Sequence, residues 1–348
     1  MVVANLHRRY TGVSATIAAL LPHQGRLCRV GLFGRDLRGA DLCDVPRLGW
    51  AEVARLGGAP LPAGRRWRIW HARRDTDMVA GIVLRDVLRH PWKLVFTSAA
   101  QKRHGRFLGG LIGRMDAVIA TTEGAAGHLD RPAVVIPHGV DTDRFYPPDD
   151  QTAVWQESGL PGRFGIGCFG RIRPSKGTDL FVNALCRVLP KHPDFTAIMT
   201  GLCKPEHRGF QEALEGRIAE AGLAGRIVFL GEVSREEIPV WHRRVALCVA
   251  PAREEGFGLT PLEAMASGSA VLASTAGAFA QLVREGETGH LVPAGDENAL
   301  AGRLERLLAR PETMLGFGRR GRETAVRDHS IAREAERVQE VYDSLGGG

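Results

Sequence analysis

The stretch Phe164-Gly165-Ile166-Gly167-Cys168-Phe169-Gly170-Arg171 decides the fold, because it is a short apolar run that ends in glycine and a charged residue. Such a run is typical of a strand buried in a parallel sheet, followed by a turn into a helix. The same order recurs along the chain and predicts strands at residues 93–96, 116–120, 134–136, 165–169, 196–199, 227–230, 245–249 and 270–273. We therefore predict an α/β fold with doubly wound, Rossmann-like parallel sheets.

A break in this pattern separates two series of strands. Residues 145–150, Phe-Tyr-Pro-Pro-Asp-Asp, combine proline and acid without periodicity, which is typical of a connection between domains. We place the boundary at 148, with an N-terminal domain over residues 1–148 and a second domain over 149–330. If the two sheets face each other, the carboxyl ends of their strands line one interdomain cleft, where ligands bind.

The composition excludes fibrous and disordered classes. The chain has 348 residues, of which 44% are hydrophobic and 24% are charged, and this is enough for two globular domains. Its six cysteines form no CxxC pair, so the sequence predicts neither a disulfide framework nor a zinc site. No signal-peptide pattern and no apolar run of spanning length is present, from which we expect a cytoplasmic protein.

Positive charge is concentrated in the first part of the chain. Residues 1–150 contain 22 Lys and Arg against 14 Asp and Glu, whereas the remainder contains 24 against 25. This asymmetry indicates an anionic partner for the N-terminal domain, which could be nucleic acid, a membrane surface or an acidic substrate. The alternative is a chain that is simply rich in arginine.

The densest functional pattern lies in the second domain. Two carboxylates, Glu255 and Glu263, flank a turn that contains Gly256 and Gly258, and a helix is expected from about Thr260. Glycines let a ligand approach the backbone, and the free N–H groups of a helix's first turn favour anions. Glu263 also fits a capping box with Thr260 as the N-cap, so a structural role stays open for it. Glu255 has no such alternative.

This stretch resembles the E-x7-E motif of the retaining glycosyltransferases of family 4, which have the GT-B fold. Residues 169–177 resemble the segment with which that family binds the donor diphosphate, with Arg171 and Lys176 at the positions of its two phosphate clamps. Three further segments fit the family, namely residues 136–141, 289–293 and 341–342. The resemblance covers most of the chain, and it implies that a last helix within residues 331–348 crosses back to the N-terminal domain.

The resemblance implies that Glu255, Arg171 and Lys176 form the catalytic centre. Glu255 would bind hydroxyls of the donor hexose, and the two cations would hold the diphosphate. The chemistry agrees, because breaking the bond to a nucleoside diphosphate releases negative charge that two cations stabilise without a metal. We expect no metal and no cofactor besides the nucleotide-sugar donor, although residues 75–77 and 141–143 carry acidic pairs like those that bind metal in other transferases. The family retains anomeric configuration, and we infer front-face substitution in which the departing phosphate assists deprotonation of the acceptor.

The same resemblance implies further donor contacts. Glu263 would bind the nucleotide ribose, and the glycine loop at Gly12 would approach the donor phosphate. Residues 231–233 lie where relatives hold the base, and residues 257–259 lie where the backbone of relatives meets the sugar and phosphates. The residues expected to bind the donor are Gly12, Arg171, Lys176, Gly231, Val233, Glu255, Gly256, Phe257, Gly258, Leu259 and Glu263.

A basic and aromatic stretch in the N-terminal domain is expected to bind the acceptor. Residues 65–74 contain five arginines and two tryptophans around an expected strand, which places His71, Arg73 and Arg74 at its cleft end. A nucleic-acid surface has a similar composition, but a single strand is no recognised module, and we expect no nucleic-acid partner.

Two further segments complete the expected acceptor site. Many members of the family carry a histidine directly after the next strand, where Thr97 and Ser98 stand in this chain. His104, from the following helix, is expected to take its place, and His138 stands where the family usually has asparagine. The expected acceptor contacts in these segments are Ser98, Gln101, His104 and His138.

Two other functional classes fit parts of the sequence. Residues 165–170 match the GxGxxG pattern of dinucleotide enzymes, but these glycines fall within the expected strand, and no ribose-binding acid follows at the expected distance. A noncatalytic sugar or lipid binder could use the same scaffold, but Arg171, Lys176 and Glu255 are all present. Donor hydrolysis separates the two classes, because a pure binder releases no nucleoside diphosphate.

Four segments together resemble the alphaproteobacterial lipopolysaccharide core mannosyltransferases, namely residues 8–14, 70–74, 98–101 and 137–141. This resemblance implies transfer of mannose from GDP-mannose to a Kdo residue of the lipid A precursor. A basic N-terminal domain suits that anionic glycolipid and also an anionic membrane, so we expect a peripheral protein on the inner face of the cytoplasmic membrane. The alternative is a different donor, UDP-glucose, UDP-galactose or UDP-GlcNAc, with another glycolipid or polysaccharide acceptor.

Overall fold

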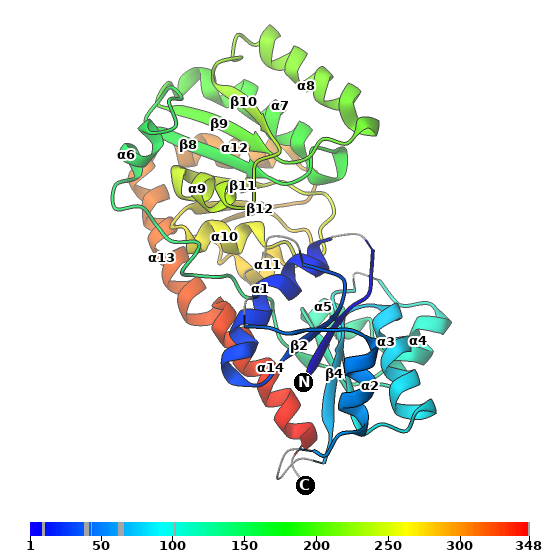
Figure 1. Cartoon of the computed structure of the whole chain (residues 1–348). Coiled ribbons are helices and arrows are strands. Elements are labelled where there is room, and N and C mark those ends of the chain that lie inside the picture. Colours follow the sequence, from blue (N-terminus) through cyan, green and yellow to red (C-terminus); the bar gives the residue numbers. More distant parts are fainter. Residues whose placement is uncertain (9–10, 38–41, 43, 62–65, 101, 347–348) are drawn as a thin grey trace. The chain divides into compact units, whose positions relative to one another are not determined.

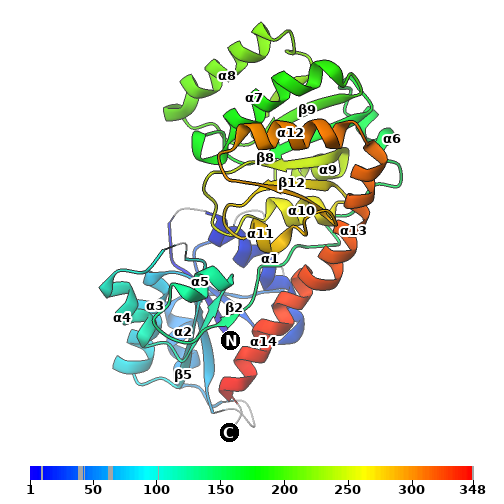
Figure 2. The same cartoon turned by 180° about the vertical axis from the view of Figure 1, so that it is seen from behind.

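The computed structural model describes residues 1–8, 11–37, 42, 44–61, 66–100 and 102–346, and its elements are drawn in Figures 1 and 2. The chain divides into two compact units. The first contains Met1–Gly139 together with Ile331–Gly348, and the second contains Val140–Ser330. The expected boundary at 148 therefore lies within the second unit. Phe145, at the start of the expected connection, is 6% exposed in the apolar core of that unit, which ties the connecting segment to it.

The first unit is built on a seven-stranded parallel sheet in the order β3-β2-β1-β4-β5-β6-β7. Its strands are β1 (Val2–Asn5), β2 (Gly31–Gly34), β3 (Arg47–Leu48), β4 (Arg68–Ala72), β5 (Trp92–Ser98), β6 (Ala117–Ala120) and β7 (Val134–Val135). Its helices are α1 (Gly12–Leu27), α2 (Trp50–Gly58), α3 (Asp75–Ile82), the short π-helix Val83–Val87 that continues α3, α4 (Arg106–Gly113), α5 (Glu123–Gly127) and α14 (Ile331–Gly346).

Both faces of this sheet are covered by apolar clusters. Along β1, Val2 belongs to one cluster and Val3 to another, as the alternation of side chains along a strand requires. The last helix of the chain completes one of these faces, because Val338 and Tyr342 of α14 pack with Val95 of β5. In Figure 1 this helix, in red, lies along α1 of the same unit. Residues at the two ends of the chain thus share one core.

The second unit is built on a six-stranded parallel sheet in the order β10-β9-β8-β11-β12-β13. Its strands are β8 (Phe164–Phe169), β9 (Phe195–Thr200), β10 (Ile227–Gly231), β11 (Val245–Ala250), β12 (Ala270–Ser274) and β13 (Gly289–Val292). Its α-helices are α6 (Gln151–Gln156), α7 (Thr178–Val188), α8 (Arg208–Glu220), α9 (Glu237–Arg244), α10 (Thr260–Ala266), α11 (Phe279–Leu282), α12 (Glu297–Leu308) and α13 (Pro311–His329). The chain runs outward from β8 to one edge and then returns through β11 to the other, so β8 and β11 flank the switch point where such sheets bind ligands.

All eight predicted strands are present, with their ends shifted by two residues at most. The expectation that Thr97 and Ser98 follow β5 is wrong, because they are the last two residues of that strand. The sequence pattern did not predict β1, β2, β3 and β13, each of four residues or fewer. Within the described ranges, no helix combines the length and the apolar composition needed to span a bilayer.

Candidate active site

A pocket of about 330 Å³, part of it open to solvent, lies in the second unit at the carboxyl ends of β8 and β11. These strands are neighbours at the centre of the sheet, so the loops that follow them meet. The residues that line the pocket are Cys168, Phe169, Gly170, Arg171, Lys176, Thr178, Ala250, Pro251, Ala252, Glu255, Thr260 and Phe279. All three residues predicted to form the catalytic centre, Arg171, Lys176 and Glu255, are among them.

Lys176 and Glu255 form an ion pair inside this pocket. Lys176 is the last residue of a short 3₁₀ turn, Pro174–Lys176, and its ammonium group donates a hydrogen bond to Glu255 Oε2. Glu255 Oε1 accepts a hydrogen bond from the Gly256 amide at 2.8 Å. About one fifth of each side chain is exposed, 21% for Lys176 and 19% for Glu255. The pair therefore offers a cation to a phosphate and a carboxylate to sugar hydroxyls from one partly buried position.

Arg171 brings a second cation to the same pocket. It lies two residues after the end of β8, its side chain is exposed, and in the described part of the chain it makes no ion pair. A planar guanidinium with free donors matches the oxygens of a phosphate. Arg171 and Lys176 can thus hold the two phosphates of a diphosphate, Arg171 from the exposed rim of the pocket and Lys176 from its partly buried wall.

Arg253 docks the loop after β11 against the loop after β8. Its guanidinium donates two parallel hydrogen bonds to Asp179, both 2.7 Å long, and a third at 2.6 Å to the Pro174 carbonyl oxygen. The Arg253 and Glu254 amides both donate to the Ser175 carbonyl oxygen, at 3.0 and 3.2 Å. These bonds hold the segment before Glu255 and the segment before Lys176 in one arrangement.

Gly177 is required for this docking. Its φ of 71° lies in the left-handed region, and a Cβ at this position would collide with the Pro251 carbonyl oxygen. We expect Gly177→Ala to lower the free energy of unfolding by roughly 2–3 kcal/mol, because the substitution adds a steric clash to the left-handed strain. Chemical denaturation with a fluorescence readout measures this change.

Gly222→Ala is the matched control. Gly222 has a φ of 70°, and nothing lies within 4 Å of a Cβ placed there. The control isolates the left-handed strain, which costs about 1 kcal/mol. Equal losses for the two variants would contradict the tight contact between the loops.

Cys168 lines the pocket but is not a nucleophile. Burial raises the pKa of its thiol to about 12, with a smaller opposing effect of the Lys176 charge. At neutral pH the group is therefore a protonated thiol, and the thiolate needed for nucleophilic attack is absent.

The turn after Glu255 is fixed by close packing. Gly258 has a φ of 80°, and a Cβ there would collide with the Phe279 ring and lie 2.7 Å from Glu255 Cγ. Phe257 is buried in the core of the unit, and Leu259 is the residue before α10. None of the predicted donor contacts Gly256, Phe257, Gly258 and Leu259 lines the pocket, although this turn positions Glu255, which does.

Glu263 lies one turn into α10. The capping box considered for it is not formed, because Thr260 is the first helical residue, Leu259 is the N-cap, and no side chain caps the helix. Glu263 Oε2 lies 3.5 Å from Nε2 of the fully buried His242. The His242 ring stacks on Phe169, a wall of the pocket, with ring centroids 3.8 Å apart. Glu263 is thus next to the pocket wall but not in its lining.

Gly231 and Val233 lie at the carboxyl end of β10, at the edge of the sheet. Gly231 is exposed, with a φ of 72°, and its carbonyl oxygen accepts from the Gly201 amide and the Thr200 hydroxyl. Two strands separate β10 from β11, and neither residue lines the pocket. Their expected contact with the base stays a prediction.

In the first unit, Gly12 opens α1, as expected, and nothing lies within 4 Å of a Cβ placed there. Arg74 lies beside it, and its guanidinium donates to Asn5 at 2.9 Å, Thr11 at 2.7 Å and Ser14 at 2.9 Å. Arg74 therefore fastens the start of α1 to β1. Much of its hydrogen-bonding capacity is used within the unit.

His71 and Arg73 are both buried. His71 has no exposed surface, and its ring nitrogens contact the Tyr342 hydroxyl at 2.5 Å and the Thr97 hydroxyl at 2.7 Å. Burial, with Arg73 nearby, holds the pKa of His71 well below its ordinary value, so the ring is neutral near pH 7. Arg73 is 7% exposed, and burial also lowers its pKa, against the charges of Glu334, Tyr342 and Asp77. His71 therefore links β4, β5 and α14, and it can act on an acceptor only through its neighbours.

The remaining acceptor candidates are held in two separate contacts. Ser98 Oγ lies 3.3 Å from His104 Nε2, which keeps these two side chains together. His104 precedes α4 and is not part of a helix, which corrects the expectation. His138 Nδ1 contacts Glu334 Oε1 of α14 at 3.0 Å, and it is 6% exposed. Gln101 lies outside the described residues, as does Arg65 of the basic stretch.

Several residues of the pocket were not predicted from the sequence. Pro251, Thr178 and Phe279 line the pocket but carry no titratable group, so a search for charged motifs passes over them. The position of Pro251 two residues after the end of the predicted strand at 245–249 was the available signal. Arg253 was quoted in the motif without a role, and its partner Asp179 is 74 residues away in sequence.

Within the described ranges, no three His, Cys, Asp or Glu side chains are grouped so that they could hold a metal ion. The carboxylates of Asp75-Thr76-Asp77 diverge, because Asp77 accepts the Leu6 and Arg74 amides while Asp75 is exposed. A reaction without metal stays a prediction.

Comparison with known proteins gives similarity over the whole chain. The family model described as glycosyl transferases group 1 matches residues 163–310. The lipopolysaccharide core biosynthesis mannosyltransferase LpcC of Rhizobium leguminosarum bv. viciae is 45% identical over 348 residues, which cover 100% of this chain and 97% of the relative. The corresponding mannosyltransferase LpsB of Rhizobium meliloti (strain 1021) is 42% identical, over 99% and 97%. HepE of Anabaena, solved in complex with UDP and glucose, superposes with a TM-score of 0.80 at 21% identity, over 99% of both chains.

Proposed function

The chain belongs to the group 1 glycosyltransferases and has their GT-B fold, and we propose that it transfers mannose from GDP-mannose to a Kdo residue of the lipopolysaccharide inner core. It is a hexosyltransferase, as the E-x7-E motif predicted. The observation that carries the proposed reaction is the pocket at the switch point, where a carboxylate and two cations meet.

In the proposed reaction Glu255 accepts hydrogen bonds from hydroxyls of the bound hexose. Arg171 and Lys176 bind the diphosphate and stabilise the negative charge that it gains as the glycosidic bond breaks. Lys176 is already oriented by Glu255, so the hexose and the phosphate are recognised by two halves of one ion pair. Substitution takes place on the front face, and a departing phosphate oxygen accepts the proton of the acceptor hydroxyl. Glu263, beside His242, binds the ribose.

Mannose and the lipopolysaccharide core are proposed because two rhizobial relatives named for both are 42–45% identical over the full chain. The Kdo carboxylate and the lipid A phosphates are anionic, which suits the excess of positive charge in residues 1–150. Such an acceptor is embedded in the inner membrane, and we place the enzyme as a peripheral protein on the cytoplasmic face of that membrane.

A donor and acceptor screen tests this function. We expect the purified protein to release GDP from GDP-mannose and to mannosylate a Kdo-lipid A acceptor, with at least a hundredfold preference over UDP-glucose, UDP-galactose and UDP-GlcNAc, because a site built to hydrogen-bond one ligand leaves polar groups unpaired with another. Mass spectrometry of the acceptor and a coupled assay for nucleoside diphosphate measure both products.

The Kdo-free lipid A precursor is the control acceptor, and it is expected to receive no mannose. Turnover with a UDP-sugar alone would assign the chain to another donor. Binding of the donor without release of nucleoside diphosphate in the presence of any acceptor would instead indicate a noncatalytic binder.

A further inference from the structure

Large apolar side chains are exposed together on one part of the first unit. Val79, Val83 and Val87 follow one another at intervals of four residues along α3 and its π-helical continuation, and they are 41%, 42% and 69% exposed. Side chains at this spacing lie on the same side of a helix. Leu88 follows at 51% exposure, and Phe107 at the start of α4 is 73% exposed. We name these five residues the α3–α4 face.

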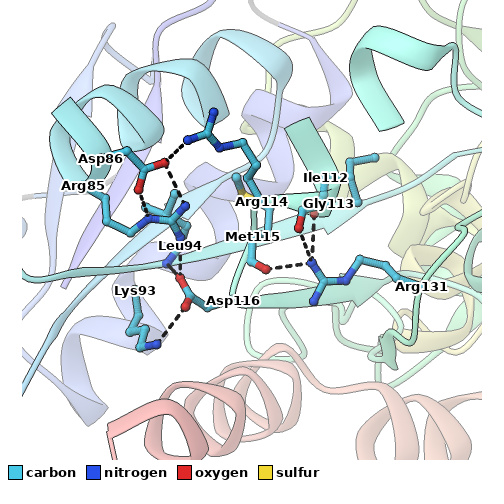
Figure 3. A network of polar contacts seen from close by, with 10 residues as sticks. All are labelled: Arg85, Asp86, Lys93, Leu94, Ile112, Gly113, Arg114, Met115, Asp116 and Arg131. Carbon is cyan, nitrogen blue, oxygen red and sulfur yellow. Dashed lines mark hydrogen bonds and ion pairs between the residues drawn. The ribbon is translucent and has the colours of Figure 1, made fainter. Parts of the chain in front are cut away.

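The two helices that carry the face are fastened to each other. Figures 1 and 2 both show α3 and α4 side by side, and the two helices are in contact. Figure 3 shows how the ends are joined: the Arg114 guanidinium, directly after α4, donates to Asp86 of the π-helix at 2.5 Å. Asp86 is the neighbour of Val87, and Arg114 lies two turns along from Phe107. The apolar side chains therefore stand on two neighbouring helices whose last turns are joined.

The same network neutralises the acidic groups near this surface. Arg85 donates to Asp86 at 2.6 Å and to Asp116 at 2.9 Å, and Lys93 donates to Asp116 at 2.8 Å (Figure 3). Hydrogen bonds from Arg85 and Arg114 lower the pKa of Asp86, although slight burial raises it. Both carboxylates are thus matched by cations, and they leave no excess of negative charge at the face.

Exposed basic residues stand next to the apolar side chains in the sequence. Arg106 adjoins Phe107 in sequence, and Arg89 adjoins Leu88. Lys102 and Arg103 precede α4. All four are exposed, and none forms an ion pair within the described residues. The face therefore combines exposed apolar groups with neighbouring exposed cations that form no ion pair within the described residues.

We propose that the α3–α4 face binds the surface of an anionic phospholipid bilayer, with Phe107 and the valines inserted among the acyl chains and the four cations on the lipid phosphates. This combination is the one that holds peripheral proteins at a membrane. A symmetric second copy of the chain is disfavoured as the occupant, because an isologous contact would bring the same unpaired cations together. The proposal deepens the peripheral attachment stated above, but its evidence is independent of donor and acceptor.

Vesicle flotation with the full-length protein tests the proposal. We expect binding to vesicles that contain one third phosphatidylglycerol and little binding to pure phosphatidylcholine. The double variant Val87→Ser/Phe107→Ser is expected to bind the anionic vesicles at least tenfold more weakly, because two exposed apolar side chains no longer insert. Arg103→Gln/Arg106→Gln is expected to lose about 25-fold, or about fivefold per cation.

Matched controls come from the second unit. Val326 on α13 is 43% exposed, and Arg319 on the same helix is exposed, so Val326→Ser and Arg319→Gln repeat the chemistry elsewhere and should bind vesicles like the wild type. Circular dichroism and release of nucleoside diphosphate in solution report whether each variant is folded, and neither readout needs a membrane.

Three results would overturn the proposal: no binding of the wild type to anionic vesicles, equal binding to neutral vesicles, or unchanged binding by both face variants. A concentration-dependent dimer that the face variants abolish would assign the face to self-association instead. If vesicles bind as expected but no donor is turned over, the proposed function fails while the membrane surface stands.

Discussion

Glu255→Gln is expected to lower kcat/KM for sugar transfer about a thousandfold while the protein stays folded. The substitution keeps the shape of the side chain but removes the charge that orients Lys176 and one of the two carboxylate oxygens available to the donor. Loss of one preorganised contact in an active site commonly costs 10²–10³ in rate, and here the loss reaches two contacts. A partly exposed ion pair adds about 1 kcal/mol or less to stability, so unfolding should change little. Steady-state kinetics with a saturating acceptor measure the effect.

Glu254→Gln is the control for this variant. Glu254 carries the same charge one residue earlier, is exposed, and does not line the pocket. It is expected to keep wild-type activity. If the two variants lose activity equally, charge near the loop matters and the position of Glu255 does not. That result would contradict the assignment of Glu255 to the donor hexose.

Arg171→Ala is expected to reduce kcat/KM by a factor of about 10² to 10³, mainly through kcat. The charge on the diphosphate grows as the glycosidic bond breaks, so a cation at the rim of the pocket acts more strongly on the transition state than on the bound donor. Because the side chain is exposed and unpaired in the described part of the chain, its removal should leave the melting temperature within about 1–2 °C of the wild type. Kinetics and a thermal melt on the same preparation separate the two effects.

Arg208→Ala repeats the change at the start of α8, where the arginine is also exposed but does not line the pocket. Wild-type kinetics are expected for it. A rise in KM for the donor at constant kcat in Arg171→Ala would mean that Arg171 binds the donor without stabilising the departing charge.

The sequence predicted best what depends on local order. Five of the six strands of the second unit, β8 to β12, were predicted, because a buried parallel strand needs a continuous apolar run and its turn needs polar residues. Arg171, Lys176 and Glu255 follow β8 and β11, and the topology of a parallel sheet brings such loops together. The pocket was therefore accessible from residue order and the family motif.

What the sequence could not give depends on contacts between distant segments. The burial of His71 follows from Tyr342, 271 residues away, and from Thr97, and no local pattern contains that information. The length of a strand does not explain why β1 was missed, because β6 has the same four residues and was predicted. The capping box for Glu263 matched in sequence, but α10 starts at Thr260, which removes the hydroxyl from the capping position.

The first unit is interrupted in sequence, and this has a consequence for biosynthesis. Its first 139 residues leave the ribosome well before Ile331, and the 191 residues of the second unit are translated in between. Until α14 emerges, Gln24 lacks the Tyr342 hydroxyl that it contacts at 3.0 Å, and His71 lacks the same group. Residues 1–139 cannot complete their core until α14 has been translated. The nascent chain therefore exposes apolar surface of the first sheet to chaperones until translation ends.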